Sequence, residues 1–100
     1  MNVIIEPDIQ KFILKLDKQT KAKVYRTIGL LGEYGNNLPM PHSKSLGSGL
    51  FELRTHGKKE IRLLYGFDTE GAIVIYGFVK KTQRTPKIAI DMAMKRLRSR

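Results

Sequence analysis

The chain has 100 residues, of which 19 are lysine or arginine and 9 are aspartate or glutamate, so its formal net charge is +10 at neutral pH. This length predicts one domain, residues 1–100, able to bury roughly two-thirds of its unfolded surface. Cysteine is absent, which excludes disulfides and thiolate metal sites. The N-terminus is not expected to be a signal peptide, because it has early acidic residues and no cationic segment before a long apolar stretch. The longest apolar run, AIVIYGFV, is far shorter than the ~20 residues of a membrane span. We expect a soluble cytoplasmic protein.

The N-terminal third predicts one short strand and two amphipathic helices. NVII at 2–5 is typical of a strand, and Pro7 with Asp8 can open the first helix. Its apolar positions follow the i, i+3, i+4, i+7 spacing: Ile9, Phe12, Ile13 and Leu16. Asp17 is expected to cap a second helix, with apolar positions Val24, Ile28 and Leu31. GNNLPMP at 35–41 cannot continue a helix and predicts a loop.

The remainder predicts three strands and a last helix. The strands are expected at 50–54, 60–67 and 72–80, joined by turns at 55–59 and 68–71. Thr85 is expected to cap the helix, with Pro86 in its first turn. The apolar positions of this helix are Ile90, Ala93, Met94 and Leu97. The order β-α-α-β-β-β-α predicts an α+β fold, a small antiparallel sheet with two N-terminal helices packed on one face and a C-terminal helix.

Strand alternation predicts which side chains share a face of the sheet. A three-residue connection at 69–71, with Gly71 in the left-handed region, would pair Asp68 with Ala72 and Arg62 with Phe78. One face would then be the core face: Ile61, Leu63, Tyr65, Phe67, Ile73, Ile75, Gly77 and Val79. Phe51 and Leu53 of the preceding strand are expected to point the same way.

The opposite face is predicted to gather Arg54, Arg62 and Lys80 around Tyr76 and Phe78. Guanidinium groups on phosphates and aromatic rings under bases are what single-stranded RNA requires. Because a single Glu52 could not offset three buried cations, we expect these cations to face solvent. An alternative for the aromatic pair is that the C-terminal helix covers it as a second small core.

The positive charge is concentrated at the C-terminal end. Residues 80–100 hold eight lysines and arginines and one acidic residue, a net charge of +7. This favours a polyanionic partner, most commonly nucleic acid, over a merely solvated tail. An acidic protein partner is a third possibility that charge alone does not distinguish. RLRSR at 96–100 is expected to be a disordered segment that contacts phosphate.

Three segments resemble the HigB-type toxins, the phage-associated branch of the RelE/ParE toxin superfamily. They are KSLGSGLFELR at 44–54, IRLLY at 61–65 and YGFVKKTQRTP at 76–86, and the resemblance covers at least residues 38–97. The resemblance implies a RelE-like fold and a messenger RNA interferase, often acting on the ribosome. It also implies a cognate antitoxin (HigA-like) with a helix-turn-helix domain.

The resemblance also implies roles for individual residues. Arg62 matches the strand arginine that holds the scissile phosphate, while Arg54, Lys80 and Lys81 match neighbouring basic positions. Apart from the resemblance, further RNA contacts are expected at Lys44, Tyr76, Phe78, Gln83 and Arg84, with antitoxin contact as the alternative for Lys44 and Gln83. Two features of RelE-type enzymes are missing: Leu50 and Glu52 stand where a lysine pair is usual, and the C-terminal tyrosine is absent.

The expected reaction is cofactor-free attack of the RNA 2′-hydroxyl on the adjacent phosphate. Arg54 and Arg62 would stabilise the phosphorane, and Lys80 or Lys81 would transfer a proton. His42 and His56 are alternatives, although histidines in turns are usually only solvated. Two other functions remain open: a ParE-like toxin that inhibits gyrase, and a non-catalytic nucleic-acid-binding module.

Overall fold

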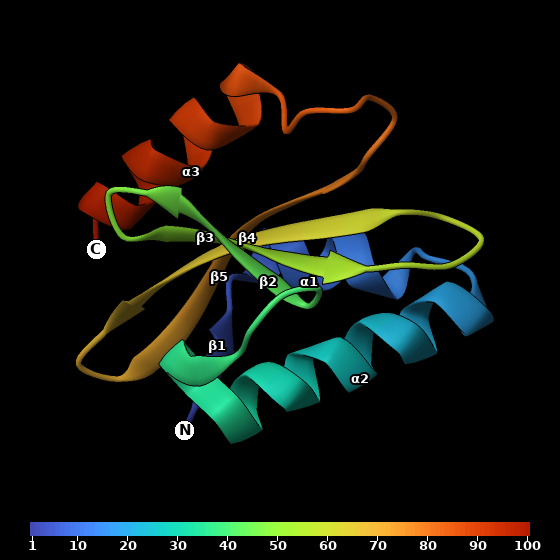
Figure 1. Cartoon of the computed structure of the whole chain (residues 1–100), viewed down its shortest axis with the longest axis horizontal. Helices are drawn as coiled ribbons and strands as arrows, with labels where there is room; N and C mark the ends of the chain where they lie inside the picture. Colours follow the sequence, from blue (N-terminus) through green and yellow to red (C-terminus); the bar gives the residue numbers. More distant parts are fainter.

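The computed structural model describes all 100 residues and consists of a five-stranded mixed sheet with helices on both faces (Figure 1). α1 and α2 cover one face and α3 covers the other. This confirms the predicted α+β fold. No helix is both long and apolar enough to span a bilayer. The elements in chain order are β1 (Val3–Ile5), α1 (Pro7–Leu14), α2 (Lys18–Tyr34), η1 (Gly35–Asn37), β2 (Ser43–Gly47), β3 (Leu50–Thr55), β4 (Ile61–Asp68), β5 (Gly71–Val79) and α3 (Lys87–Arg98).

The sheet has the strand order β1-β5-β4-β3-β2, with the two edges formed by short strands. β1 pairs with β5 in parallel, whereas every other pair is antiparallel. The sheet is therefore mixed at one edge and antiparallel elsewhere. β2 was not predicted, because the mostly exposed sequence SKSLG has no apolar alternation to mark it as a strand. Such short polar strands are common at sheet edges.

The larger core lies between α1, α2 and the sheet and confirms the predicted helix stripes. Its buried residues from the helices are Ile9, Ile13, Val24, Ile28 and Leu31, and Phe12 and Leu16 pack against them. Asp17 caps α2 as predicted, because its side chain accepts a hydrogen bond from the Thr20 backbone N–H at 3.1 Å. Leu53, Leu63 and Tyr65 meet the helices from the sheet.

The β4–β5 hairpin differs from the predicted register near its turn. Asp68 pairs with Gly71 rather than Ala72, so the connection has two residues, Thr69 and Glu70. A register shift between Leu64 and Tyr65 leaves an extra residue, Ile75, in β5. This bulge restores the predicted pairing of Arg62 with Phe78.

The bulge also changes which face the β5 side chains take. Ala72 and Val74 belong to the core under α1 and α2, whereas Ile73 and Ile75 belong to the core under α3. The predicted common face for Ile73, Ile75, Gly77 and Val79 is therefore wrong for the first two. Alternation alone cannot reveal a bulge, because the extra residue inverts the pattern without altering composition.

α3 covers a second, smaller core on the opposite face of the sheet. Ala89 and Ala93 are buried there, and their small side chains let the helix lie close to the strands. The sheet contributes the buried residues Leu50, Leu64, Ile73 and Ile75. Tyr76 and Phe78 pack against this core and are half-buried, which is the alternative that the sequence left open for them.

Thr85 does not cap α3, contrary to the prediction. The N-cap is Pro86, which has no side chain able to make a capping hydrogen bond. The Thr85 hydroxyl instead donates a hydrogen bond to the carboxylate of Glu52 on β3. Thr85 thus ties the segment before α3 down onto the sheet.

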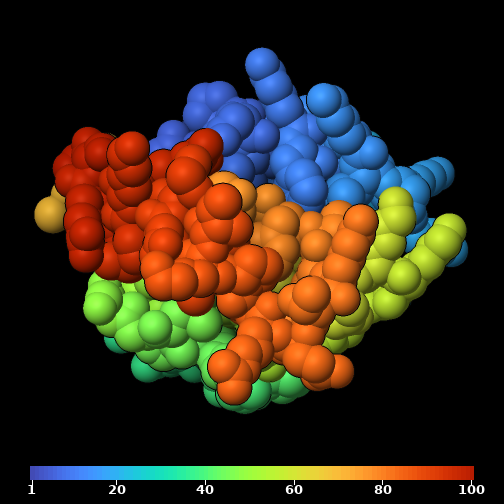
Figure 2. All heavy atoms as spheres, turned by 90° about the horizontal axis from the view of Figure 1, so that it is seen from above, coloured from blue at the N-terminus to red at the C-terminus, as the bar shows by residue number.

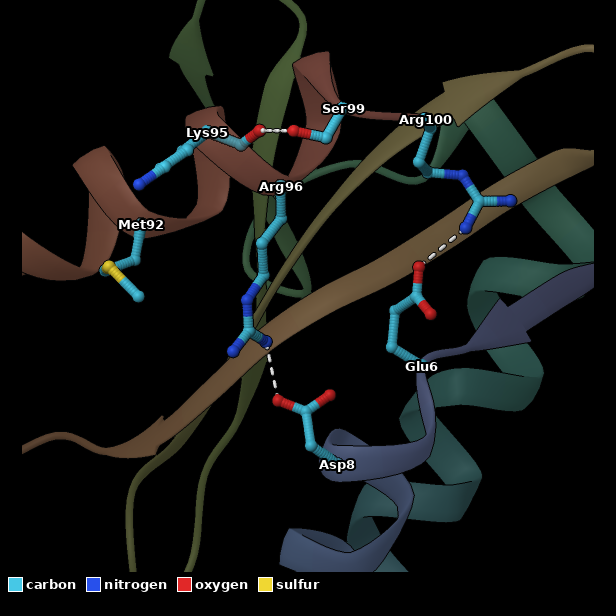
Figure 3. Close-up of a pocket in the computed structure, with 7 residues that line it drawn as sticks. All are labelled: Glu6, Asp8, Met92, Lys95, Arg96, Ser99 and Arg100. Carbon is cyan, nitrogen blue, oxygen red and sulfur yellow. Dashed lines mark hydrogen bonds and ion pairs between the residues drawn. The ribbon is translucent and has the colours of Figure 1, made fainter.

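The C-terminal residues are ordered by ion pairs, so the expected disordered basic tail is wrong. Arg96 Nη1 lies 2.6 Å from Asp8 Oδ2, and Arg100 Nη1 lies 2.6 Å from Glu6 Oε1. Figure 3 shows both ion pairs. Arg100 also pairs with Asp68. These contacts join α3 to the N-terminal elements and use two of the C-terminal cations within the protein itself.

The Asp17 cap makes a prediction about acid stability. Hydrogen bonds from the Thr20 hydroxyl and backbone N–H lower the pKa of Asp17 to about 2. A lowered folded-state pKa contributes stability that is present above the ordinary carboxyl pKa and lost as pH falls toward 2. Asp17→Ala should therefore lower the melting temperature at pH 7, with the deficit shrinking as the pH falls toward 2.

Asp17→Asn is the matched control, because an amide oxygen still caps a helix. It should recover most of the melting temperature at pH 7. An Asp17→Ala deficit that is independent of pH would contradict this account.

Candidate nucleic-acid interface

The sheet face under α3 changes from apolar to charged along three neighbouring strands. At its apolar end the face is covered by α3, and at the other end it is not. The sequence of side chains along the face is Leu50, Glu52 and Arg54 on β3; Leu64 and Arg62 on β4; and Tyr76, Phe78 and then Lys80 along and beyond β5. Because neighbouring strands are in register here, the charged ends meet.

Glu52 is the centre of this charged cluster. Its side chain is 0% exposed, and its Oε1 accepts a hydrogen bond from Arg54 Nε at 2.9 Å. Burial alone would raise the pKa of Glu52. Hydrogen bonds from Thr85 and Arg54, together with the charges of Arg54 and Lys80, outweigh burial and hold that pKa below its ordinary value. Glu52 is therefore a buried carboxylate ion.

Arg62 lies opposite Arg54 in the β3–β4 register and is also buried, with a side chain 5% exposed. Its Nε is 3.7 Å from Glu52 Oε1 and has no hydrogen-bond partner. Its Nη2 donates to Glu60 Oε1 at 3.1 Å, and its Nη1 donates to the Ile61 carbonyl at 3.0 Å. The expectation that Arg62 faces solvent is wrong. That expectation counted Glu52 as the only carboxylate beside the cations, whereas Glu60 is a second one that pairs with Arg62.

Arg62 nevertheless lines an open groove at the end of β4 and β5. The groove has a volume of about 420 Å³ and no hydrophobic residue in its wall. Its lining residues are Glu60, Arg62, Lys80, Lys81, Thr82 and Gln83. Lys80 is held beside β4 by a hydrogen bond from its backbone N–H to the Glu60 carbonyl at 2.8 Å. Figure 2 shows the segment after β5 (orange) on the surface, next to the β3–β4 turn (yellow-green).

Two smaller hollows contain other predicted site residues. One, of about 330 Å³, is mainly apolar and shares Lys81 and Thr82 with the groove. Its other lining residues are Tyr76, Phe78, Val79, Pro86, Ile88 and Ala89. The second, of about 230 Å³, lies between α2 and β3 and includes Arg54, His42 and His56. A further hollow, about 490 Å³, contains the Arg96 and Arg100 ion pairs and is separate from these (Figure 3).

The structure brings together four of the predicted site residues and separates the rest. Arg62, Lys80, Lys81 and Gln83 share the groove. Arg54 is joined to Arg62 through Glu52 but opens onto the hollow beside α2. Tyr76 and Phe78 line the adjoining apolar hollow. Lys44 on β2 and Arg84 lie outside the groove.

Sequence reasoning missed Glu60 as a member of the site. Glu60 precedes Arg62 by two residues, so strand alternation puts the two side chains on one face, and this spacing was the signal that could have found it. His56 Nδ1 lies 2.7 Å from Glu60 Oε1, a contact made by the β3–β4 turn. No cluster of three or more histidine, aspartate or glutamate side chains is placed to hold a metal ion.

The fold and this groove define a small basic α+β protein with a polar, cation-lined site at the open end of its sheet. The chain belongs to the Gp49-like family of phage-derived proteins (DUF891), whose model matches residues 11–98. This family is a toxin-like family of toxin–antitoxin systems. No curated protein matches the chain.

The Glu52 cluster makes a prediction about stability. Removing one partner from a buried ion pair leaves the other charge unpaired, which costs about 3–5 kcal/mol. Glu52→Gln keeps the shape of the side chain but removes its charge, so it should lower the free energy of unfolding by several kcal/mol at pH 7. Because the folded-state pKa of Glu52 is lowered, the difference should narrow as the pH falls below the ordinary carboxyl pKa.

Glu33→Gln is the matched control, because Glu33 is an exposed carboxylate of α2. It should leave the free energy of unfolding within about 0.5 kcal/mol of the wild-type value. Urea unfolding measures both variants. Equal stability of the wild type and Glu52→Gln would show that the buried cluster is not held by this carboxylate.

Proposed function

We propose that the protein is a HigB-type toxin of a type II toxin–antitoxin system, acting as a metal-independent messenger RNA interferase. The single observation that carries this proposal is the groove in which the buried Arg62 meets Lys80 and Lys81. Membership of a toxin-like family supports the biological setting. The ribosome as the place of action and a helix-turn-helix antitoxin of the HigA type are parts of the same proposal.

The groove has the chemistry of a phosphate site. Lys80 and Lys81 provide flexible ammonium groups at its wall, and neither forms a salt bridge with a carboxylate. Arg62 lines the groove and donates from Nη2 to Glu60, while its Nε is buried near Glu52. A guanidinium that neighbouring carboxylates hold in place is a preorganised donor for a phosphate oxygen. Phosphate binding therefore requires little rearrangement of the protein backbone.

The apolar hollow next to the groove suits a nucleotide base. Lys81 and Thr82 line both spaces, so a phosphate in the groove and a base against Phe78 or Tyr76 would belong to neighbouring parts of one strand. Aromatic surfaces bind unpaired bases by stacking and tolerate different sequences. Single-stranded RNA is thus a better fit than a duplex, whose bases are already stacked.

Cleavage in this site follows from its charges. Attack of the 2′-oxygen on the neighbouring phosphate produces a phosphorane with increased negative charge, which Arg62 and the two lysines would stabilise. A lysine ammonium would supply the proton that the departing 5′-oxygen requires. The products are a 2′,3′-cyclic phosphate and a 5′-hydroxyl, and the reaction needs no divalent cation.

Neutralising Lys80 and Lys81 together tests this proposal while keeping Glu52 and its hydrogen bonds from Arg54 and Thr85. Lys80→Gln/Lys81→Gln should lower the rate of messenger RNA cleavage by about 100-fold or more, because two groups that act on the transition state are lost. Both side chains lie at the surface of the groove, so the melting temperature should change little. Primer extension on transcripts from induced cells measures the cuts, and growth arrest measures toxicity.

The matched control is Lys95→Gln/Arg98→Gln, which removes the same charge from exposed positions of α3. It should cut messenger RNA as the wild type does. Transcripts that stay intact while the wild-type protein causes DNA damage signals would favour gyrase inhibition instead. Intact transcripts with neither effect would favour a non-catalytic binding module.

A further inference from the structure

Glu60 is the one carboxylate in the wall of the groove, and its position differs from that of the buried Glu52. It directly precedes β4, and its backbone carbonyl accepts the hydrogen bond from Lys80. Its side chain is 38% exposed, whereas that of Glu52 is 0% exposed. A ligand in the groove can therefore reach Glu60 directly, while Glu52 is closed to it.

Three donors hold the Glu60 carboxylate in place. Oε1 lies 2.7 Å from His56 Nδ1 and 3.1 Å from Arg62 Nη2, and Oε2 accepts from the Gly57 backbone N–H at 3.3 Å. Burial acts to raise the pKa of Glu60, but the hydrogen bonds from His56, Gly57 and Arg62 outweigh it and lower that pKa. The group is therefore ionised at neutral pH, so its oxygens carry no proton; the lowered pKa also makes it a weaker base than an ordinary carboxylate.

RNA cleavage requires a proton acceptor close to the phosphate-binding group, because the attacking 2′-hydroxyl lies next to the phosphate. The lysines of the groove cannot fill this role as ammonium ions, since an ammonium group has only donors. Within the groove, Glu60 is the anionic acceptor, and it already contacts the arginine that would bind the phosphate.

We propose that Glu60 is the general base of the reaction, with His56 orienting its carboxylate; this inference rests on the proposed function. The 2′-oxygen forms its bond to phosphorus as its proton passes to Glu60. The bond between phosphorus and the 5′-oxygen breaks, its electron pair stays on that oxygen, and Lys80 or Lys81 supplies the proton. Water then returns the proton from Glu60 to the lysine, so no co-reactant is consumed.

Two other roles for Glu60 make different predictions. If its carboxylate only occupies the phosphate site of Arg62, removing the charge should strengthen RNA binding and speed cleavage. If it only ties the β3–β4 turn together through Gly57 and His56, removing the charge should lower stability and leave the reaction rate of the folded protein unchanged. A general base predicts slower cleavage with RNA binding retained.

The test compares Glu60→Gln with the wild type in two measurements. One is single-turnover cleavage of a messenger RNA in a reconstituted translation reaction, and the other is the affinity for an RNA oligonucleotide carrying 2′-deoxy substitutions, which cannot be cleaved. We expect the rate to fall by about 100-fold or more. The affinity for the uncleavable oligonucleotide should be equal or higher, because a negative charge beside Arg62 is lost.

Glu60→Asp is the matched variant, because it keeps the carboxylate on a shorter side chain. It should recover part of the rate that Glu60→Gln loses, and a melting curve shows that both variants are folded. Cleavage by Glu60→Gln at or above the wild-type rate would overturn the assignment of Glu60 alone. Absence of cleavage by the wild-type protein would overturn the proposed function, and this inference with it.

Discussion

The site depends on one buried carboxylate. Glu52 has no exposed side-chain surface, yet it contacts Arg54, lies near Arg62 and accepts a hydrogen bond from Thr85. Two arginines placed opposite each other on adjacent strands would repel without it, and Thr85 would have no anchor on the sheet. Glu52 therefore offsets the positive charge of both arginines. Through Thr85 it also anchors the segment between β5 and α3 to the sheet.

This arrangement explains how a small protein builds a rigid cationic site. Arg62 is held from two sides, by Glu52 below and Glu60 beside it, so its guanidinium is preorganised and mostly withdrawn from water. Lys80 and Lys81 line the same groove and form no salt bridge with a carboxylate. This combination suits phosphate chemistry. A guanidinium held in place can orient the phosphate, and the ammonium groups of the lysines can move toward the negative charge that develops during the reaction. Arg96 and Arg100 form ion pairs with Asp8 and Glu6, which hold the C-terminal end of the chain against the N-terminal elements. Part of the net positive charge is therefore not available to a partner.

Much of the fold could be predicted from the sequence because it depends on local spacing. The stripes that contain Ile13 and Val24 required only helical periodicity, and Asp17 required only a capping position. The bulge at Ile75 could not be predicted, since two pairing registers satisfy the same alternation until the turn length is known. Thr85 was assigned to a cap for a local reason, whereas its actual partner lies 33 residues away in sequence.

The charged site was predictable in part of its membership but not in its energetics. Alternation placed Arg62 and Lys80 on one face, and the groove brings them together. The exposure of Arg62 was overestimated because the carboxylate of Glu60, two residues away, was not counted as its partner. Ion pairs that cross a turn, or join a loop to a sheet, depend on side-chain positions that periodicity does not specify. These ion pairs determine which cations have no carboxylate partner.

The central claim, that RNA binds in the groove at the end of β4 and β5, is tested most directly by mapping the contact in solution. Backbone amide NMR signals should be followed while a single-stranded oligonucleotide with 2′-deoxy substitutions is added to the wild-type protein. The account predicts that the largest shifts fall at 60–62 and 80–83, with smaller ones at 76–78. Shifts confined to the far end of α3, or none at all, would contradict it.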